Sequence, residues 1–297
     1  MKKRVFFFGT PEIAVPALEE LTKISDIEIV GVGCPRDKKI GRKRILTPCA
    51  VKSSAKKLGL KVFSVNNKQE VEKIYEKFEF DLAIVIAFGV IFPAKILNFP
   101  KFGTINVHFS LLPKFRGASP VQSAILAGEK ESGITFQQMV KELDAGDILW
   151  QKKWDIQNQK TSELWNFFAK KTAEELPEFL KKLFSRKIKP QKQDEHKATF
   201  CGKFVKNDGE IFPEKNTADE VWRKYLAFDV WPEIFIKTKY GKIKLKKISR
   251  EPVPDSFGLR CLNNSEIYII EAQIPGKRVM LIKEILHGYR DLFEKME

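Results

Sequence analysis

Three polar residues, Asn106, His108 and Asp144, have the types and spacing that suit acyl transfer to an amine. Asn106 and His108 lie two apart in the alternating stretch 104–108, which predicts a half-buried strand with both side chains on one face. Asp144 follows in a glycine-containing turn after a second predicted strand, Gly133 to Met139. An amide can donate to an oxyanion, a histidine can move a proton, and a carboxylate can orient the histidine. A purely structural histidine is the alternative, and spacing alone favours it.

The loop after the first strand predicts a binding edge. It contains Ser110, Leu111, Leu112 and Pro113, and a helical pattern resumes only after a further glycine and proline. Open α/β sheets place ligands beyond the carboxyl ends of their strands, so we expect a pocket here. Arg116, in the same loop, suits either an anionic ligand or a structural ion pair, and both interpretations stay open.

The N-terminal half predicts a Rossmann-like, doubly wound and mostly parallel sheet. An apolar strand at 4–8 turns through Gly9-Thr10-Pro11 into a helix at 12–23, and a second strand follows at 27–33. The continuous apolar run 81–87 is typical of a strand buried on both faces. Because the Gly-x-Gly-x-x-Gly fingerprint is missing, we do not expect a dinucleotide ligand.

The C-terminal part predicts a second, smaller domain. A basic linker is expected at 187–204, where the composition becomes charged and polar, between domains at 1–186 and 205–297. After a helix at 217–228, short strands separated by turn residues suit a small β-barrel. The strands are expected at Ile234–Thr238, Lys242–Ser249, Ile267–Ile270 and Val279–Leu286.

Charge is the strongest feature of the composition. The chain of 297 residues has a formal net charge of +15, which indicates a polyanionic partner. Ten Lys or Arg against one acid fall within 36–61, and we expect 34–47 to be an exposed loop that contains Arg42, Lys43 and Arg44. A second basic group, Lys242, Lys244 and Lys246, alternates along one strand face, which suits phosphate contacts. In both places a solvated charged surface is the alternative.

Other functional classes are excluded by simple patterns. No apolar run approaches the length of a membrane span, and no signal-peptide core follows the first residues, so we expect a cytoplasmic protein. The cysteines lie far apart without a Cys-x-x-Cys pair, which predicts free thiols and neither a zinc site nor disulfides. They are Cys34, Cys49, Cys201 and Cys261.

The combined motifs resemble those of the formyltransferases that use 10-formyltetrahydrofolate. The similar stretches are Asn-x-His-x-Ser-Leu-Leu-Pro-x-x-Arg-Gly-x-x-Pro from residue 106, Gly-Ile-Thr-Phe from 133 and Leu-Asp-Ala-Gly-Asp from 143. Phe8-Gly9-Thr10-Pro11 and the C-terminal half make the chain most similar to the methionyl-tRNA branch. The resemblance implies catalytic roles for Asn106, His108 and Asp144, no metal, and an OB-like C-terminal domain that binds tRNA.

The resemblance also implies a folate pocket and a tRNA contact. The pocket would be formed by Phe88, Gly89, Val90 and Ile91 together with Ser110, Leu111, Leu112 and Pro113. Core packing explains residues 88–91 equally well, and Phe88 replaces the tyrosine that is usual in the family. Arg42 matches an arginine of a basic loop that approaches the tRNA, although Lys43 stands where the family has glycine.

We therefore expect transfer of formyl from 10-formyltetrahydrofolate to the α-amine of methionine on initiator methionyl-tRNA. One alternative is formylation of a smaller amine, such as a phosphoribosyl glycinamide or an amino sugar nucleotide, against which the basic stretch 36–61 speaks. The other is a non-catalytic RNA-binding protein on a transferase fold. Retention of Asn106, His108 and Asp144 together speaks against that alternative.

Overall fold

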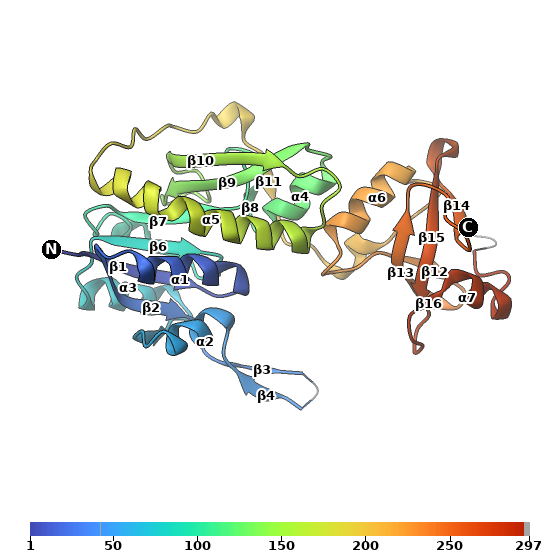
Figure 1. The fold of residues 1–297 in the computed structure, drawn as a ribbon, viewed down its shortest axis with the longest axis horizontal. Helices are drawn as coiled ribbons and strands as arrows, with labels where there is room; N and C mark the ends of the chain where they lie inside the picture. Colours follow the sequence, from blue (N-terminus) through green and yellow to red (C-terminus); the bar gives the residue numbers. More distant parts are fainter. Residues whose placement is uncertain (42, 294–297) are drawn as a thin grey trace. The chain divides into compact units, whose positions relative to one another are not determined.

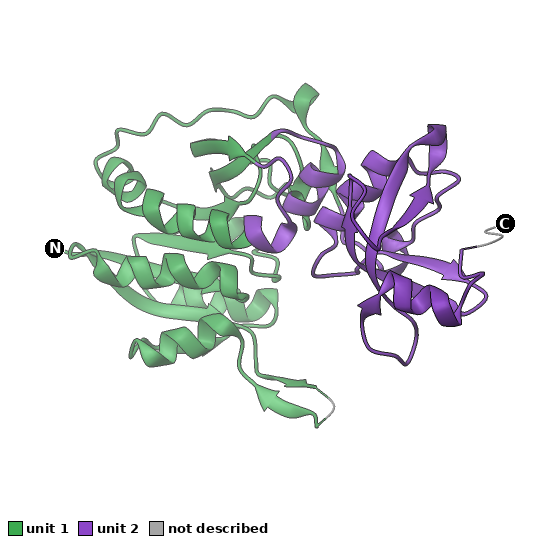
Figure 2. Ribbon diagram, turned by 45° about the vertical axis from the view of Figure 1, so that its right-hand side comes forward, with its two compact units in different colours: residues 1–120, 131–155, 165–201 green, residues 121–130, 156–164, 202–297 purple. Residues whose placement is uncertain are grey.

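A computed structural model describes residues 1–41 and 43–293. The described chain divides into two compact units (Figure 2). Unit 1 comprises residues 1–120, 131–155 and 165–201, and unit 2 comprises 121–130, 156–164 and 202–297. Within the described residues, no helix is long and apolar enough to cross a membrane.

The central sheet of unit 1 has seven strands within the described residues, in the order β10-β9-β7-β6-β1-β2-β5 (Figure 1). The strands are β1 (Lys3–Gly9), β2 (Ile27–Cys34), β5 (Val62–Ser64), β6 (Leu82–Ile86), β7 (Thr104–His108), β9 (Glu131–Gln138) and β10 (Ile148–Asp155). Neighbours from β5 to β7 pair in parallel, whereas β9 pairs antiparallel with both β7 and β10. The predicted mixed α/β fold with a mainly parallel sheet is confirmed.

Helices cover both faces of this sheet. They are α1 (Val15–Lys23), α2 (Ala50–Lys57), α3 (Lys68–Lys77) and α5 (Thr161–Phe184). A further helix, α4 (Pro120–Leu126), follows the loop after β7. Phe6 and Phe8 of β1 pack in one buried cluster with α3. On the opposite face, an added Cβ at Gly9 would lie 3.1 Å from Ala14 and 3.2 Å from Val51 of α2. Alternating side chains of β1 thus point to opposite helical layers.

The strand order places the ligand crevice at the carboxyl ends of β1 and β6, next to β7. The chain moves outward from β1 to β2 and β5, and then returns to β6 on the other side of β1. Such a reversal opens a crevice beyond the carboxyl ends of the central strands. Asn106 lies opposite Val85 of β6, so its side chain shares the face of the α3 cluster. Phe179 of α5 packs on the other face, 4.5 Å from the ring of Phe136.

The basic stretch 34–47 is not the predicted loop, because it contains two paired strands. β3 (Lys38–Ile40) and β4 (Ile45–Thr47) form an antiparallel hairpin whose residues are mostly exposed (Figure 1). Its high charge hid the strand pattern, since neither face of the hairpin is buried. Helix α5 continues through Pro177 without a break.

Unit 2 contains a second sheet, in the order β12-β13-β15-β14, with β16 beside β15. Its elements are α6 (Ala218–Ala227), β12 (Phe235–Thr238), β13 (Gly241–Ser249), β14 (Phe257–Arg260), β15 (Glu266–Gln273), β16 (Met280–Leu281) and α7 (Ile282–Gly288). The predicted strand at 279–286 is wrong beyond Leu281. Ile282 and Ile285 are three apart and both 1% exposed, which is the spacing of a helical face.

Candidate active site

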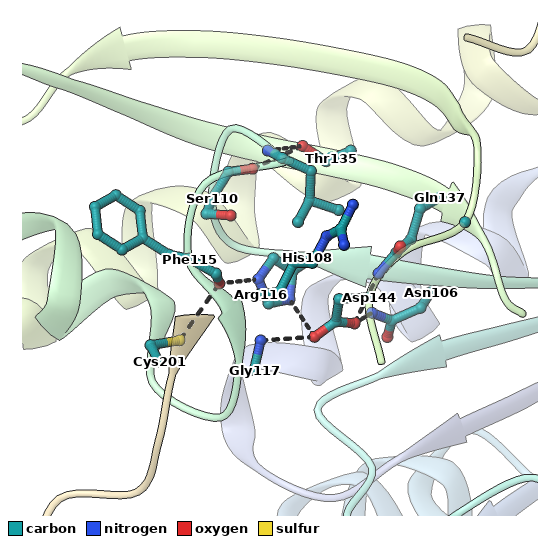
Figure 3. A network of polar contacts seen from close by, with 12 residues as sticks. Asn106, His108, Ser110, Phe115, Arg116, Gly117, Thr135, Gln137, Asp144 and Cys201 are labelled. Carbon is teal, nitrogen blue, oxygen red and sulfur yellow. Dashed lines mark hydrogen bonds and ion pairs between the residues drawn. The ribbon is translucent and has the colours of Figure 1, made fainter. Parts of the chain in front are cut away.

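The structure brings together the three residues singled out by their chemistry (Figure 3). Asn106 and His108 project from the same face of β7, and Asp144 lies in the turn after β9, which pairs with β7. The Nδ1 atom of His108 lies 3.7 Å from Oδ2 of Asp144. Nδ2 of Asn106 donates to Oδ1 of Asp144 at 3.4 Å. The carboxylate is therefore the common neighbour of both strand residues.

Asp144 receives two further hydrogen bonds. Nε2 of Gln137 donates to Oδ1 at 2.7 Å, and the backbone N–H of Gly117 donates to Oδ2 at 2.9 Å. The side chain of Asp144 is only 12% exposed. Because these partners are donors and an ionised carboxylate only accepts, they fix both the position and the rotation of the group.

His108 is oriented by a main-chain carbonyl. Its Nε2 atom lies 2.8 Å from the oxygen of Phe115, and a carbonyl can only accept, so Nε2 carries a hydrogen. In the neutral ring the lone pair is then on Nδ1, the atom that faces Asp144. A proton gained at Nδ1 would be stabilised by the nearby carboxylate. The geometry thus makes Nδ1 the atom that can take up and return a proton.

Gly117 cannot be replaced without moving the backbone. It lies in β8 (Arg116–Gly117), which pairs in parallel with β11 (Phe200–Cys201). Its φ is +123°, and an added Cβ would stand 2.0 Å from the carbonyl oxygen of Cys201. Only glycine permits this close approach. The backbone N–H that donates to Asp144 therefore requires a glycine at position 117.

Comparison with known proteins identifies the family to which the chain belongs. A family model described as formyl transferase matches residues 1–180. The chain belongs to the formyl transferase family. Curated methionyl-tRNA formyltransferases are similar along almost the full length: that of Bacillus cereus strain G9842 is 34% identical over 96% of this chain and 95% of its own, and that of Bacillus mycoides strain KBAB4 is 35% identical over the same shares.

Solved structures share the fold of this formyl transferase. WlaRD, a sugar 3N-formyl transferase crystallised with dTDP and 5-N-formyl-THF, has a TM-score of 0.69 at 19% identity, covering 94% of this chain and 100% of WlaRD. HypX from Aquifex aeolicus in complex with tetrahydrofolic acid has a TM-score of 0.67 at 17% identity, covering 97% of this chain. The chain spans about half the length of HypX, 48%.

The loop 110–113 of the formyl transferase is rigidly held at the site edge. The buried hydroxyl of Ser110 donates to the carbonyl of Lys114 at 2.6 Å. Thr135 Oγ1 donates to the Ser110 carbonyl at 2.6 Å. Leu112 is buried, while Leu111 and Pro113 are half-buried. Thr135 of β9 therefore fixes the backbone of the loop.

Residues 88–91 divide between core and surface. Phe88 is half-buried and packs 5.5 Å from the ring of Phe8, and Val90 also contacts that cluster. Ile91 is 80% exposed, and an added Cβ at Gly89 would meet no atom within 4 Å. The loop therefore closes the core with Phe88 and Val90 and exposes Ile91, and its role in a folate pocket stays a prediction.

The two basic groups differ in their surroundings. Lys43 and Arg44 are exposed on the hairpin, while Arg42 lies outside the described residues. On β13, by contrast, Lys244 and Lys246 both donate to the carboxylate of Glu233. Lys242 lies over the ring of Phe235 at 4.4 Å. The β13 lysines are therefore partly engaged by their own unit.

Arg116 serves as a structural ion-pair partner. Its side chain is 3% exposed, and its guanidinium donates to Glu195 at 2.7 and 2.9 Å. Two more bonds go to the Oε1 atom of Gln193, at 2.9 and 3.0 Å. The alternative role in binding an anionic ligand is not supported, because these groups already use the guanidinium.

Sequence reasoning missed the residues that hold the three polar side chains. Gln137 lies opposite Asn106 in the antiparallel pair, and strand parity could have found it. The Phe115 carbonyl, Gly117 N–H and Gln193 amide act through tertiary contacts that no local pattern signals. Within the described residues there is no cluster of three or more side chains able to hold a metal, and none of the four cysteines forms a disulfide.

Proposed function

We propose that this formyl transferase transfers the formyl group of 10-formyltetrahydrofolate to the α-amine of methionine on initiator methionyl-tRNA. The observation that carries the proposal is the convergence of Asn106, His108 and Asp144 at the sheet edge, in a chain 34% identical to methionyl-tRNA formyltransferases over 96% of its length. On this proposal the reaction occurs in the cytoplasm, where initiator tRNA is used.

The three side chains divide the work of acyl transfer. The co-substrate supplies the formyl carbon, and its nitrogen leaves with the electron pair of the broken C–N bond and takes up a proton. Nδ2 of Asn106 has two hydrogens, of which one points to Asp144 and the other can donate to the oxyanion. Nδ1 of His108 takes the proton that the attacking amine loses and can return it. Asp144 stabilises the protonated ring.

The chain has the features that a folate ligand requires at this edge. Pterin rings bind between apolar walls with a few fixed polar groups. The exposed Ile91, the edge of Phe88 and the open space at Gly89 lie in the loop that follows β6, directly beside β7. The fixed loop 110–113 follows β7 at the same edge. We therefore assign residues 88–91 and 110–113 to the folate pocket.

The basic groups support binding of tRNA. We assign phosphate contacts to the exposed hairpin residues Lys43 and Arg44, with Arg42, and to Lys242, Lys244 and Lys246 of β13. Glu233 competes for two of the β13 lysines, so a phosphate must displace a carboxylate there. We also propose that the C-terminal part, 205–297, is an OB-like tRNA-binding domain. The basic segment 187–204 joins it to the catalytic residues 1–186, and residues 187–201 of this segment belong to unit 1.

A substrate comparison tests the proposal. Purified protein is supplied with 10-formyltetrahydrofolate and one of four amines: initiator methionyl-tRNA, elongator methionyl-tRNA, free methionine or an amino sugar nucleotide. We expect rapid formylation of the initiator methionyl-tRNA alone. Preferential formylation of the sugar nucleotide would overturn the proposal and favour the small-amine alternative, which rests at present on likeness of fold. No formylation of any amine would favour the non-catalytic alternative.

A further inference from the structure

The segment between α5 and unit 2 is built into the candidate active site. We call residues 191–201 the strap; all of them belong to unit 1. Gln191 exchanges two backbone hydrogen bonds with Ile148 of β10, at 2.8 and 2.9 Å, and Phe200–Cys201 pair with β8. The strap is therefore fixed at both ends to the elements that surround the site.

Gln193, the third residue of the strap, forms hydrogen bonds with both the nitrogen and the oxygen of its side-chain amide. Its Nε2 atom donates to the carbonyl of Asp144 at 2.8 Å and to the carbonyl of Gly146 at 2.7 Å. Its Oε1 atom accepts both bonds from the Arg116 guanidinium. Since two carbonyls face the nitrogen and a cation faces the oxygen, only one orientation of the amide satisfies all four bonds.

The strap also contacts the residue that orients His108. The N–H of Phe115 donates to Oγ1 of Thr199 at 2.8 Å, and the Cys201 thiol donates to the carbonyl of Phe115 at 3.3 Å. Phe115 has a φ of +60°, a conformation that a bulky residue adopts only when its surroundings impose it. The oxygen that holds Nε2 of His108 thus depends on the strap.

We propose that the strap is a functional part of the active site and that Gln193 is a positioning residue for Asp144. The inference rests on the proposed formyl transfer. Gln193 ties the turn at Asp144 to Arg116, the neighbour of Phe115, so that the carboxylate and the imidazole are kept at their separation of 3.7 Å. Because a shift of about 1 Å at a reacting group can cost about 10²-fold in rate, loss of this amide should slow turnover without removing any group that touches substrate.

Two substitutions separate positioning from simple packing. Gln193→Met keeps the length of the side chain but removes all four bonds. Gln193→Glu keeps the attraction to Arg116 but places an oxygen against the carbonyls of Asp144 and Gly146. It therefore disrupts only the contacts with the turn at Asp144. Lys189→Ala, a change at an exposed residue just outside the strap, is the matched control. Single-turnover rate, kcat, the KM of each substrate and the melting temperature are measured for each variant.

We expect both Gln193 variants to lose about 10²-fold in kcat. Their KM values should stay within a few-fold of wild type. Their melting temperatures should fall by a few degrees at most, because loss of hydrogen bonds to buried groups costs about 1–3 kcal/mol. Lys189→Ala should match wild type throughout. Wild-type kcat in both variants would overturn the inference. So would a defect confined to KM, or loss of the fold in both variants, which would make Gln193 a stability residue. If wild type formylates a different amine, the proposed function fails, and the same comparison is made with that amine.

Discussion

Replacing Asp144 with asparagine changes the centre of the hydrogen-bond network while keeping its shape. In the wild type, Oδ1 accepts from Asn106 and Gln137, and Oδ2 accepts from the N–H of Gly117 and faces His108. An asparagine has one oxygen and one NH2 group. One side of the new amide must therefore turn hydrogens towards a group that also donates.

The size of the effect follows from these contacts. Whichever way the amide of Asp144→Asn turns, a largely buried donor loses its acceptor, which costs about 1–3 kcal/mol in the free energy of unfolding. The charge that stabilises a proton on His108 is also lost, and with it general acid–base catalysis worth about 10²- to 10⁴-fold. Affinity for tRNA should not change, because Asp144 is assigned to the formyl-transfer step and the phosphate contacts are assigned to other residues.

Single-turnover formylation, equilibrium unfolding in urea and tRNA binding, measured side by side, test this prediction. Asn106→Ala and His108→Ala serve as companions and should each lower turnover about 10²- to 10⁴-fold with tRNA binding kept. Turnover within a few-fold of wild type in Asp144→Asn would refute the assigned role. A fall in tRNA affinity equal to the fall in rate would show that the residue acts in binding instead.

Three further predictions concern the ligand sites and one thiol. Gly89→Val should leave the melting temperature of the ligand-free protein unchanged, since open space surrounds the position. It should reduce the stabilisation by 10-formyltetrahydrofolate, which is about 2.7 kcal/mol at a hundredfold excess over Kd. Equal thermal shifts in both proteins would contradict this prediction. Lys244→Ala combined with Lys246→Ala should weaken initiator and elongator tRNA alike and flatten the log–log salt dependence of binding by about 0.7–0.9 per lost phosphate contact; an unchanged slope would make these lysines a solvated face. A hydrogen bond from the Cys34 thiol lowers the pKa of Cys49 to about 6. The rate of alkylation of Cys49 by iodoacetamide should therefore rise with pH around a midpoint near 6. A midpoint near the ordinary thiol value of about 8.5 would refute this prediction.

Most of the sheet of unit 1 was predictable because burial leaves a clear signal. β1 and β6 are continuous apolar runs, and β7 alternates between buried and site-facing residues. The β3–β4 hairpin was missed because exposed lysines show no alternation. β14 was also missed, since in its four residues only Leu259 is buried. Local sequence therefore predicts strands well only where the sheet has an apolar face.

The site was predictable to a different degree for each kind of residue. Asn106 and His108 share a strand face, so parity and motif brought them together correctly. Their supports lie far away in sequence: the amide of Gln193 bonds a carbonyl 49 positions earlier. Arg116 remained ambiguous because a guanidinium suits a ligand and an internal carboxylate equally well. Only the position of Glu195 decides between them.

The strap also limits how the protein can be divided or fused. The segment between two domains ordinarily tolerates insertions and cuts, since few contacts cross it. Here the register of β11 against β8 and the reach of Gln193 fix the number of residues between them. A fragment that stops at residue 186 would lack the strap, so excision or domain exchange should be made after Cys201, where the last of the three segments of unit 2 begins. Relatives with a longer segment should place the extra residues outside 191–201.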